Sequence, residues 1–375
     1  MQFVVDDEQM MLRDSVRGFL ESRAPLGRVR ALMETDIGYD PSVWAEMAGL
    51  GWQGLAIGEE YGGAGYTLRE LGVVMEELGR SLLPSPFLST VILGAGVIAA
   101  AGSEEQRSQL LAEIAGGDRL VALAVVEPGR GWDPADIATT WRRDDEGFVV
   151  DGVKSYVLDG HIADTLVVSA LSEEGGVDLF LVESDAPGVD RRLLETMDMT
   201  RKQAEVSLSA VRLSAPARLG SPGSAPSVLD DLYDTAAVAL AHEQVGGAQR
   251  CLDMSVAYAK DREQFGRAIG SFQAVKHMCA DMLIRLESAR SAAYHAAWAA
   301  AVGDTGELPI AAALAKACCS EAFFENAGDT IQIHGGIGFT WEHDAHLFFK
   351  RAKSDEILFG DPSRWRARLA DLLGI

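Results

Sequence analysis

Positive charge is scarce in this chain of 375 residues. Lysine and arginine together number 33 against 56 aspartates and glutamates, which gives a formal net charge of −23. A chain this acidic repels nucleic acid and anionic membrane surfaces, so we expect neither as a partner. Any phosphate-bearing ligand must therefore bind in a local basic pocket, because the overall field of the protein opposes it.

Other features that the chain lacks narrow its class further. No apolar run reaches the 18 residues of a membrane-spanning helix, and residues 1–8 (MQFVVDDE) lack the basic start of a signal peptide. We therefore expect a cytoplasmic protein without a membrane partner. The cysteines have no metal-site spacing and are expected to be reduced, and we expect no metal; they are Cys251, Cys279, Cys318 and Cys319.

Apolar residues make up 48% of the chain, which is enough for packed cores, and their pattern divides the chain into three parts. Residues 1–117 are typical of helices, residues 118–222 of short strands separated by Gly, Asp and Pro, and residues 223–375 of long helices. The sequence therefore predicts an α+β fold with a helical N-terminal domain, a middle antiparallel β domain and a C-terminal four-helix bundle.

Individual elements can also be assigned from the pattern. In the two helical parts we predict helices at 8–20, 68–83, 88–101, 227–260, 272–302, 309–334 and 362–373. In the middle part, β-branched runs bounded by turn residues predict strands at 120–126, 136–141, 147–152, 154–158, 165–170, 177–182 and 205–208.

Two segments in the C-terminal part stand out from the helical pattern. Residues 261–266 (DREQFG), followed by 269–273 (IGSFQ), place glycines in a long helical region, where glycine is unfavourable. A loop that carries Arg262, Phe265 and Gln273 on a helical scaffold is suited to hold something anionic and flat. Residues 332–339 (QIHGGIGF) form a second glycine-rich segment.

Together the two segments resemble the flavin-binding signature of the acyl-CoA dehydrogenase family. Other motifs follow in the family's order, at 60–65 (EYGGAG), 75–79 (MEELG), 126–128 (VEP), 151–154 (DGVK) and 335–343 (GGIGFTWEH). The resemblance covers essentially the whole chain. It implies FAD-dependent α,β-desaturation of an acyl-CoA thioester, in which a carboxylate removes the α proton while hydride leaves Cβ for the flavin. It also implies an oligomer and an electron-transfer flavoprotein or similar acceptor.

The resemblance implies a set of FAD contacts that reach a cofactor held mainly by a neighbouring subunit. Arg262 would neutralise the pyrophosphate with paired hydrogen bonds, and glycines would let the ligand approach the backbone closely. The alternatives are a surface ion pair for Arg262 and a helix C-cap for the glycines. The residues implied are Arg262, Phe265, Gln273, Gln332, Gly335 and Gly336.

The positions that would contact the flavin ring within the same subunit differ from the family. The family has a hydroxyl before Glu-Pro, a serine further on and a Trp-x-Thr trio beyond the lysine. This chain has Val126, Trp132, Tyr156 and Leu158 at those positions. Three hydroxyl donors are therefore lost, and only an aromatic surface remains at Tyr156.

Both positions where the family carries its catalytic glutamate are also changed, to Phe359 and Ala236. Two nearby carboxylates remain as candidate bases. Asp361 lies two residues after Phe359, and Glu243 lies about two helical turns after Ala236 on the same face. Each has a structural interpretation that we favour, Asp361 as an N-cap before Pro362 and Glu243 as a hydrogen-bonded carboxylate.

Three hypotheses follow. In the first, the chain is a partner subunit of an FAD-dependent acyl-CoA dehydrogenase, and it completes the flavin site of a homologous chain in a hetero-oligomer. Family members with such divided duties act on bulky acyl-CoAs such as steroid side chains. In the second, it is a self-sufficient homo-oligomeric dehydrogenase that uses Asp361 or Glu243. In the third, it is a non-catalytic scaffold that binds acyl-CoA or protein, against which Arg262 and the glycine-rich segment argue.

Overall fold

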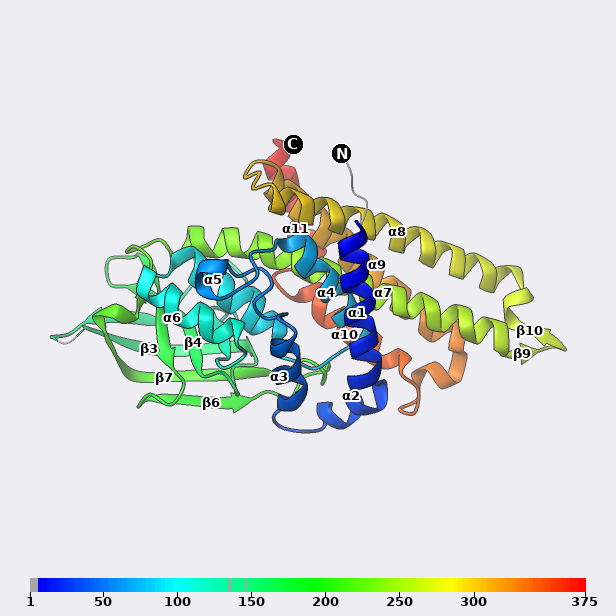
Figure 1. The fold of residues 1–375 in the computed structure, drawn as a ribbon, viewed down its shortest axis with the longest axis horizontal. Coiled ribbons are helices and arrows are strands. Elements are labelled where there is room, and N and C mark those ends of the chain that lie inside the picture. Colours follow the sequence, from blue (N-terminus) through cyan, green and yellow to red (C-terminus); the bar gives the residue numbers. More distant parts are fainter. Residues whose placement is uncertain (1–5, 134–135, 146) are drawn as a thin grey trace. The chain divides into compact units, whose positions relative to one another are not determined.

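The computed structural model describes residues 6–133, 136–145 and 147–375 (Figure 1). Along the chain, helices come first, then a sheet, then helices again, as predicted. The chain forms two compact units. Unit 1 contains Met1–Ala31, Thr67–Leu83 and Ala237–Ile375, and unit 2 contains Leu32–Tyr66 and Pro84–Ala236. No helix in the described part of the chain is long and apolar enough to cross a membrane.

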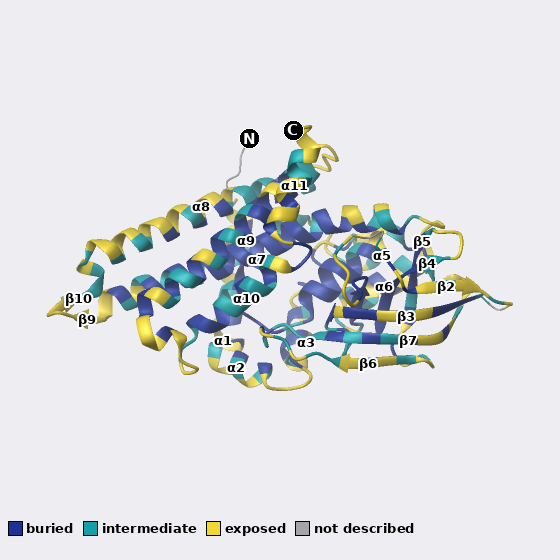
Figure 2. Ribbon diagram, turned by 180° about the vertical axis from the view of Figure 1, so that it is seen from behind, coloured by how far each residue is buried: buried dark blue, intermediate teal, exposed yellow. Residues whose placement is uncertain are grey.

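Among the described residues of unit 1, all regular structure is helical apart from one small hairpin. Its helices are α1 (Asp7–Arg23), most of α2 (Leu26–Met33), α4 (Leu68–Ser81), most of α7 (Ala225–Asp261), α8 (Gln273–Ala301), α9 (Glu307–His334), α10 (Ala345–Ile357) and α11 (Pro362–Leu373). Helix α8 presents a long exposed face (Figure 2). The sequence predicted these helices except α2 and α10. Asp344 stands at the N-cap position of helix α10, but its side chain makes no cap hydrogen bond there.

The helices of unit 2 come from the N-terminal part and the start of α7. They are α3 (Pro41–Gly49), the π-helix η2 (Phe87–Gly94), α5 (Ala95–Ala101) and α6 (Glu104–Ala115). The predicted helix at 88–101 is therefore two elements in sequence, a buried π-helix and a short α-helix. A π-helix has the same apolar composition as a buried α-helix, so the sequence pattern does not distinguish them.

An eight-stranded sheet forms the centre of unit 2, in the order β6-β7-β3-β2-β4-β5-β8, with β1 also paired to β4. Its core gathers Trp141, Phe148 and Phe180, whose ring centroids are 5.1–5.6 Å apart. The strands are β1 (Val121–Ala124), β2 (Thr140–Arg143), β3 (Gly147–Leu158), β4 (Thr165–Ser172), β5 (Val177–Glu183), β6 (Val189–Leu193), β7 (Gln203–Ser214) and β8 (Arg218–Leu219).

The sheet differs from the predicted antiparallel arrangement in four respects. Strands β1 and β2 run parallel to β4, so the sheet is mixed. The predicted strands 147–152 and 154–158 form one strand, β3, with irregularities in its pairing to β7, and the predicted strand at 136–141 begins only at Thr140. Edge strand β6 was missed because its sequence, VDRRL, is charged and none of its residues is fully buried.

Two glycines allow helices α4 and α7 of unit 1 to cross in direct backbone contact. A Cβ at Gly246 on α7 would lie 1.7 Å from the carbonyl oxygen of Glu76 on α4. A Cβ at Gly79 on α4 would lie 2.0 Å from the carbonyl oxygen of Glu243 on α7. Each helix therefore needs a glycine where the other presents a carbonyl, which accounts for the glycine that ends the 75–79 motif.

We expect Gly246→Ala to destabilise the protein by about 2–3 kcal/mol, because the methyl group forces two packed backbones apart. The matched control is Gly18→Ala on helix α1, where no atom lies within 4 Å of the added Cβ. There, better helix propensity should stabilise the protein by up to about 1 kcal/mol. Urea denaturation measures both changes, and equal effects of the two substitutions would contradict the proposed crossing.

The same crossing buries His242 of α7. Its ring lies 2.8 Å from the place of a Cβ at Gly72 on α4, and its centroid is 4.9 Å from that of Tyr294 on α8. His242 is 1% exposed, so its imidazole is removed from water. Burial lowers the pKa of His242 from 6.5 to about 4, so the imidazole is neutral at pH 7.

This lowered pKa predicts a loss of stability in acid. Between pH 6.5 and 4 the unfolded chain binds a proton at His242 that the folded chain does not, so stability falls as the pH falls through that window. The full contribution is about 3 kcal/mol, from a pKa difference of about 2.5. We expect His242→Leu to lose less stability than the wild type over this range. Denaturation at several pH values tests this, and parallel pH profiles would refute it.

Candidate functional site

The predicted Arg262 loop is a two-residue β-hairpin at the end of helix α7. Strands β9 (Glu263–Gln264) and β10 (Arg267–Ala268) pair across a turn at Phe265 and Gly266. Both turn residues have positive φ, 55° and 75°, as in a type I′ turn. Glycine accepts this conformation readily, but a bulky aromatic residue rarely adopts it. Phe265 is also 91% exposed, so the loop holds a strained aromatic ring in solvent.

The side chains of this loop leave polar and aromatic groups available. The Phe265 ring meets Phe272 edge-on at 6.1 Å, and the Arg267 guanidinium lies 4.1 Å from the Phe272 centroid. Arg262 is exposed, and its guanidinium makes no hydrogen bond or ion pair with the residues that the structure describes. Gln273 is exposed at the first position of α8. The loop therefore fits the predicted contacts to an anionic, flat ligand.

The second predicted segment begins where helix α9 ends. Gly335, with φ of 63°, caps the helix and donates its N–H to the carbonyl of Gln332 or Ile331. The C-cap interpretation therefore holds for Gly335. Gly336 has neither a positive φ nor an atom within 4 Å of its Cβ position. Nothing within the described chain requires a glycine at 336, and Gln332, Gly335 and Gly336 are all exposed.

Aromatic stacking brings the two predicted segments together. Tyr258, four residues before Arg262, stacks on His334 with ring centroids 4.3 Å apart, and His334 in turn meets His343 at 4.3 Å. Arg30 of α2 fixes the following loop through hydrogen bonds to the Asp344 carboxylate (2.8 Å) and the His343 carbonyl (2.9 Å). Sequence reasoning missed Tyr258 and Arg30, because no motif marks either.

The position of the family's catalytic glutamate is closed. Phe359 lies between α10 and α11 with a φ of 62° and is 1% exposed. Its carbonyl accepts a hydrogen bond from the Trp365 indole at 3.1 Å. The phenyl ring can neither accept a proton nor reach solvent, so this segment presents no base.

A buried lysine holds the segment that contains Phe359. Lys316 of α9 is fully buried, and its ammonium donates to the carbonyls of Asp355 (3.0 Å) and Glu356 (3.1 Å) in the last turn of α10. Burial lowers the pKa of Lys316 to about 8. The sequence did not indicate this role, because Lys316 lies within an alanine-rich helix without a motif. Its ammonium satisfies carbonyls that the end of α10 would otherwise leave unpaired.

Both carboxylates considered as alternative bases have structural partners. Asp361 accepts the Arg364 backbone N–H at 2.9 Å and caps helix α11, with Pro362 at its first position. Glu243 receives a 2.6 Å hydrogen bond from the Arg351 guanidinium, and both side chains are 4% exposed. Ala236, the other changed position, is fully buried.

The flavin-ring positions lie in unit 2 and offer little polarity. Val126 and Leu158 are 7% and 4% exposed, and Trp132 packs edge-on against Tyr233 at 6.0 Å. Tyr156 projects into solvent with a positive φ of 56°, at the irregularity between Lys154 and Val157 in strand β3. The hydroxyl donors expected for a flavin ring are therefore replaced by apolar surface and one exposed aromatic ring.

Two family motifs of unit 2 meet in one buried ion pair. The Lys154 ammonium lies 2.7 Å from Glu127, 3.0 Å from the Ser169 hydroxyl and 3.2 Å from the Val125 carbonyl. The Glu127 carboxylate also accepts the backbone N–H groups of Ala138 (2.7 Å) and Thr139 (2.8 Å). Burial lowers the pKa of Lys154 to about 8. The pair fixes the chain on both sides of the flavin-ring position 126.

We expect Lys154→Met to cost about 3–5 kcal/mol of stability, because Glu127 is left buried without its cation. The double variant Glu127→Gln/Lys154→Met should recover part of this loss, since it removes both charges. A double-mutant cycle by urea denaturation measures the coupling. Losses that simply add across the cycle would show that the two side chains do not stabilise each other.

The chain matches known proteins over almost its whole length. Models of the N-terminal, middle and C-terminal domains of acyl-CoA dehydrogenase match residues 6–118, 122–211 and 231–372. The acyl-CoA dehydrogenase IpdE2 of Mycolicibacterium smegmatis is 36% identical over 97% of this chain and 98% of its own length. A chain of the ChsE4-ChsE5 complex from Mycobacterium tuberculosis superimposes with a TM-score of 0.90 at 28% identity, covering 100% of this chain and 99% of its own. A chain of the Tcur3481-Tcur3483 steroid ACAD reaches 0.88 at 34% identity, covering 99% of each chain.

Proposed function

Because the chain belongs to the acyl-CoA dehydrogenase family, whose enzymes are FAD-dependent oxidoreductases, we propose that it is a partner subunit that completes the FAD site of a homologous chain. The observation that carries this proposal is the fully buried Phe359 at the position of the catalytic glutamate. The chain lacks a base where the family needs one, so the proton must be taken by a carboxylate of another subunit.

The distribution of kept and lost contacts supports the same conclusion. Arg262 and Phe265, which in the family reach a neighbour's cofactor, are present, exposed and without competing polar partners among the described residues. Val126 and Leu158, at positions that would contact the chain's own flavin ring, are buried and apolar. A chain that held its own flavin would be expected to keep both sets.

The two structural neighbours named above add support of a different kind. One is a chain of the ChsE4-ChsE5 complex, and the other is a chain of the Tcur3481-Tcur3483 steroid ACAD. By analogy, this chain pairs with a homologous chain, and the assembly acts on a bulky acyl-CoA such as a steroid side-chain thioester. An electron-transfer flavoprotein or similar acceptor would reoxidise the cofactor.

Bound FAD would supply the hydride acceptor, and this chain's residues would hold and orient it. The Arg262 guanidinium would make paired hydrogen bonds to the pyrophosphate, which a planar fork of N–H donors allows. Phe265 would cover an apolar face of the cofactor, which accounts for a strained ring kept in solvent. Gln332 and the open backbone at Gly335 and Gly336 would meet the adenosine half, and Gln273 would bond a polar edge.

The two alternatives fit the structure less well. For a self-sufficient enzyme, Glu243 would have to give up its buried partner Arg351, and Asp361 would have to give up its cap on α11. Either exchange leaves a charge or a backbone donor unsatisfied. A scaffold without a cofactor has no use for an exposed Phe265 at positive φ, because the strain there would bring no compensating contact.

The visible absorption spectrum tests the proposal. We expect the chain purified alone to be colourless, and the chain co-produced with a homologous acyl-CoA dehydrogenase chain that carries the catalytic glutamate to bind flavin. In that assembly Arg262→Ala should lower the flavin content several-fold, the effect of removing charged hydrogen bonds. Arg142→Ala, which alters an exposed arginine of unit 2, is the control and should leave the flavin content unchanged.

Bound flavin together with desaturase activity in the chain alone would overturn the proposal and favour the self-sufficient enzyme. A colourless product both alone and with the partner would favour the scaffold. Flavin content that is equal in Arg262→Ala and wild-type assemblies would refute the assigned role of the hairpin.

A further inference from the structure

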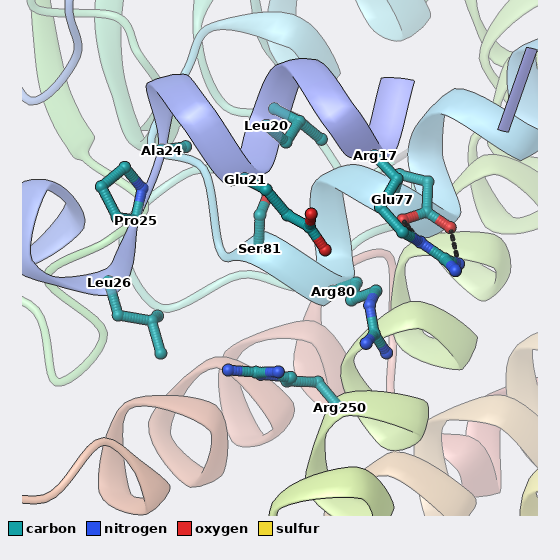
Figure 3. Close-up of a pocket in the computed structure, with 10 residues that line it drawn as sticks. All are labelled: Arg17, Leu20, Glu21, Ala24, Pro25, Leu26, Glu77, Arg80, Ser81 and Arg250. Atoms are coloured by element: carbon teal, nitrogen blue, oxygen red, sulfur yellow. Dashed lines mark hydrogen bonds and ion pairs between the residues drawn. The ribbon is translucent and has the colours of Figure 1, made fainter. Parts of the chain in front are cut away.

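A cavity of about 340 Å³ lies within unit 1, away from the residues assigned to FAD (Figure 3). The end of α1, the link to α2, the last turn of α4 and the middle of α7 border it, and it is open to solvent on one side. It is lined by Arg17, Leu20, Glu21, Ala24, Pro25, Leu26, Glu77, Arg80, Ser81 and Arg250. Its volume lies near the lower end of the range for small-molecule sites.

The polar wall of the cavity gathers three guanidinium groups from three helices. Arg17 is neutralised by Glu77 through two hydrogen bonds of 2.6 and 3.0 Å, and Arg80 by Asp253 at 2.5 Å. Arg250 has no hydrogen bond or ion pair within the described part of the chain. Within the described residues, Arg250 is therefore the one guanidinium of this wall that is not already held by a carboxylate, in a protein whose net charge is −23.

The position of Arg250 is not explained by helix electrostatics. Arg80 lies in the last turn of α4, where a cation stabilises the helix dipole. Arg250 lies near the middle of α7, where no such benefit exists. The same helix carries Asp253 three residues later, yet that carboxylate is engaged by Arg80 and Gln249. Arg250 is therefore free to bind an anion from outside the chain, in competition with the Glu21 carboxylate that lines the same cavity.

The opposite wall of the cavity is apolar. Leu20 is buried on α1 and Ala24 is buried just after its end, and Pro25 and Leu26 continue the surface into the start of α2. Figure 3 shows Pro25 and Leu26 on one side, with the Arg80 and Arg250 side chains on the other. An inorganic anion would leave this apolar wall in water, whereas an aliphatic body would bury it.

Because one wall of the cavity carries guanidinium groups and the opposite wall is apolar, we propose that the cavity binds a carboxylate with a short aliphatic chain. Its head group lies against Arg250 and Arg80, and its chain lies against Leu20, Ala24 and Leu26. A planar carboxylate matches the fork of N–H donors on a guanidinium, which makes such hydrogen bonds strong and directional. Nothing in the proposed FAD role uses these residues, so the two proposals stand or fall independently.

Glu21 provides a second test of the proposal, in which the expected change in affinity is an increase and not a decrease. Its carboxylate lines the same cavity near Arg80, and it makes no hydrogen bond or ion pair with the described residues. A bound carboxylate would be repelled by Glu21. Glu21→Gln should therefore strengthen binding, whereas loss of Arg250 should weaken it.

Equilibrium dialysis with octanoate, on the chain in its purified assembly, tests the site. We expect saturable binding of one octanoate per chain, weakened about tenfold or more in Arg250→Ala, the loss expected when one charged hydrogen bond is removed. Glu21→Gln should bind more tightly than the wild type. Arg142→Ala, an exposed arginine of unit 2, is the matched control and should bind as the wild type does. Octan-1-ol and inorganic phosphate should each bind more weakly than octanoate, since each meets only one wall.

Octanoate binding that survives Arg250→Ala would overturn the proposal. So would phosphate binding as tight as that of octanoate, because the apolar wall would then play no part. Weaker binding in Glu21→Gln would also overturn it, and the gain expected there cannot arise from a misfolded variant.

Discussion

The close crossing of helices α4 and α7 is the constraint on which most of unit 1 depends. At this crossing each helix places a glycine against a carbonyl of the other, Gly246 against Glu76 and Gly79 against Glu243. Helices held this closely leave no room for water between them, so a buried carboxylate at the crossing is costly unless the protein itself supplies a hydrogen-bond partner. Glu243 meets Arg351, and Glu76 accepts a hydrogen bond from Tyr294 at 2.6 Å. Because Arg250 lies on α7, the same contact between the helices places its side chain beside the cavity.

Two buried lysines hold the chain at the positions where the family's reacting groups would lie. Lys154 fixes the strand and loop around position 126, and Lys316 fixes the turn around position 359. Both supports are kept in this chain although the groups that they would position, a hydroxyl and a carboxylate, are replaced by Val126 and Phe359. In the partner-subunit proposal, the scaffold of the family's site is therefore present in this chain without the reacting side chains.

The sequence predicted much of the fold, because long apolar periods and turn residues act locally. Helices such as α11 and strands such as β5 follow directly from their patterns. The parallel pairing of β1 and β2 with β4 could not be predicted, because pairing direction depends on contacts distant in sequence. The residues of the candidate site also differ in whether the sequence alone could predict them. Arg262 and Gly335 lie in recognisable motifs, whereas Tyr258, Arg30 and Lys316 act through tertiary contacts that leave no local signal. Asp361 was correctly interpreted as a helix cap, since a cap is a local feature.

The exposed Phe265 has a consequence for how the protein is made. Phe265 forms an exposed apolar surface at the ends of α7 and α9, together with Phe339 (78% exposed) and Ile337 (48% exposed). While the chain is alone, this surface favours association with other molecules. If a homologous partner chain covers these side chains, copies of this chain in excess of the partner would leave them exposed and would self-associate. Synthesis of the two chains in matched amounts then becomes a requirement for solubility as well as for activity.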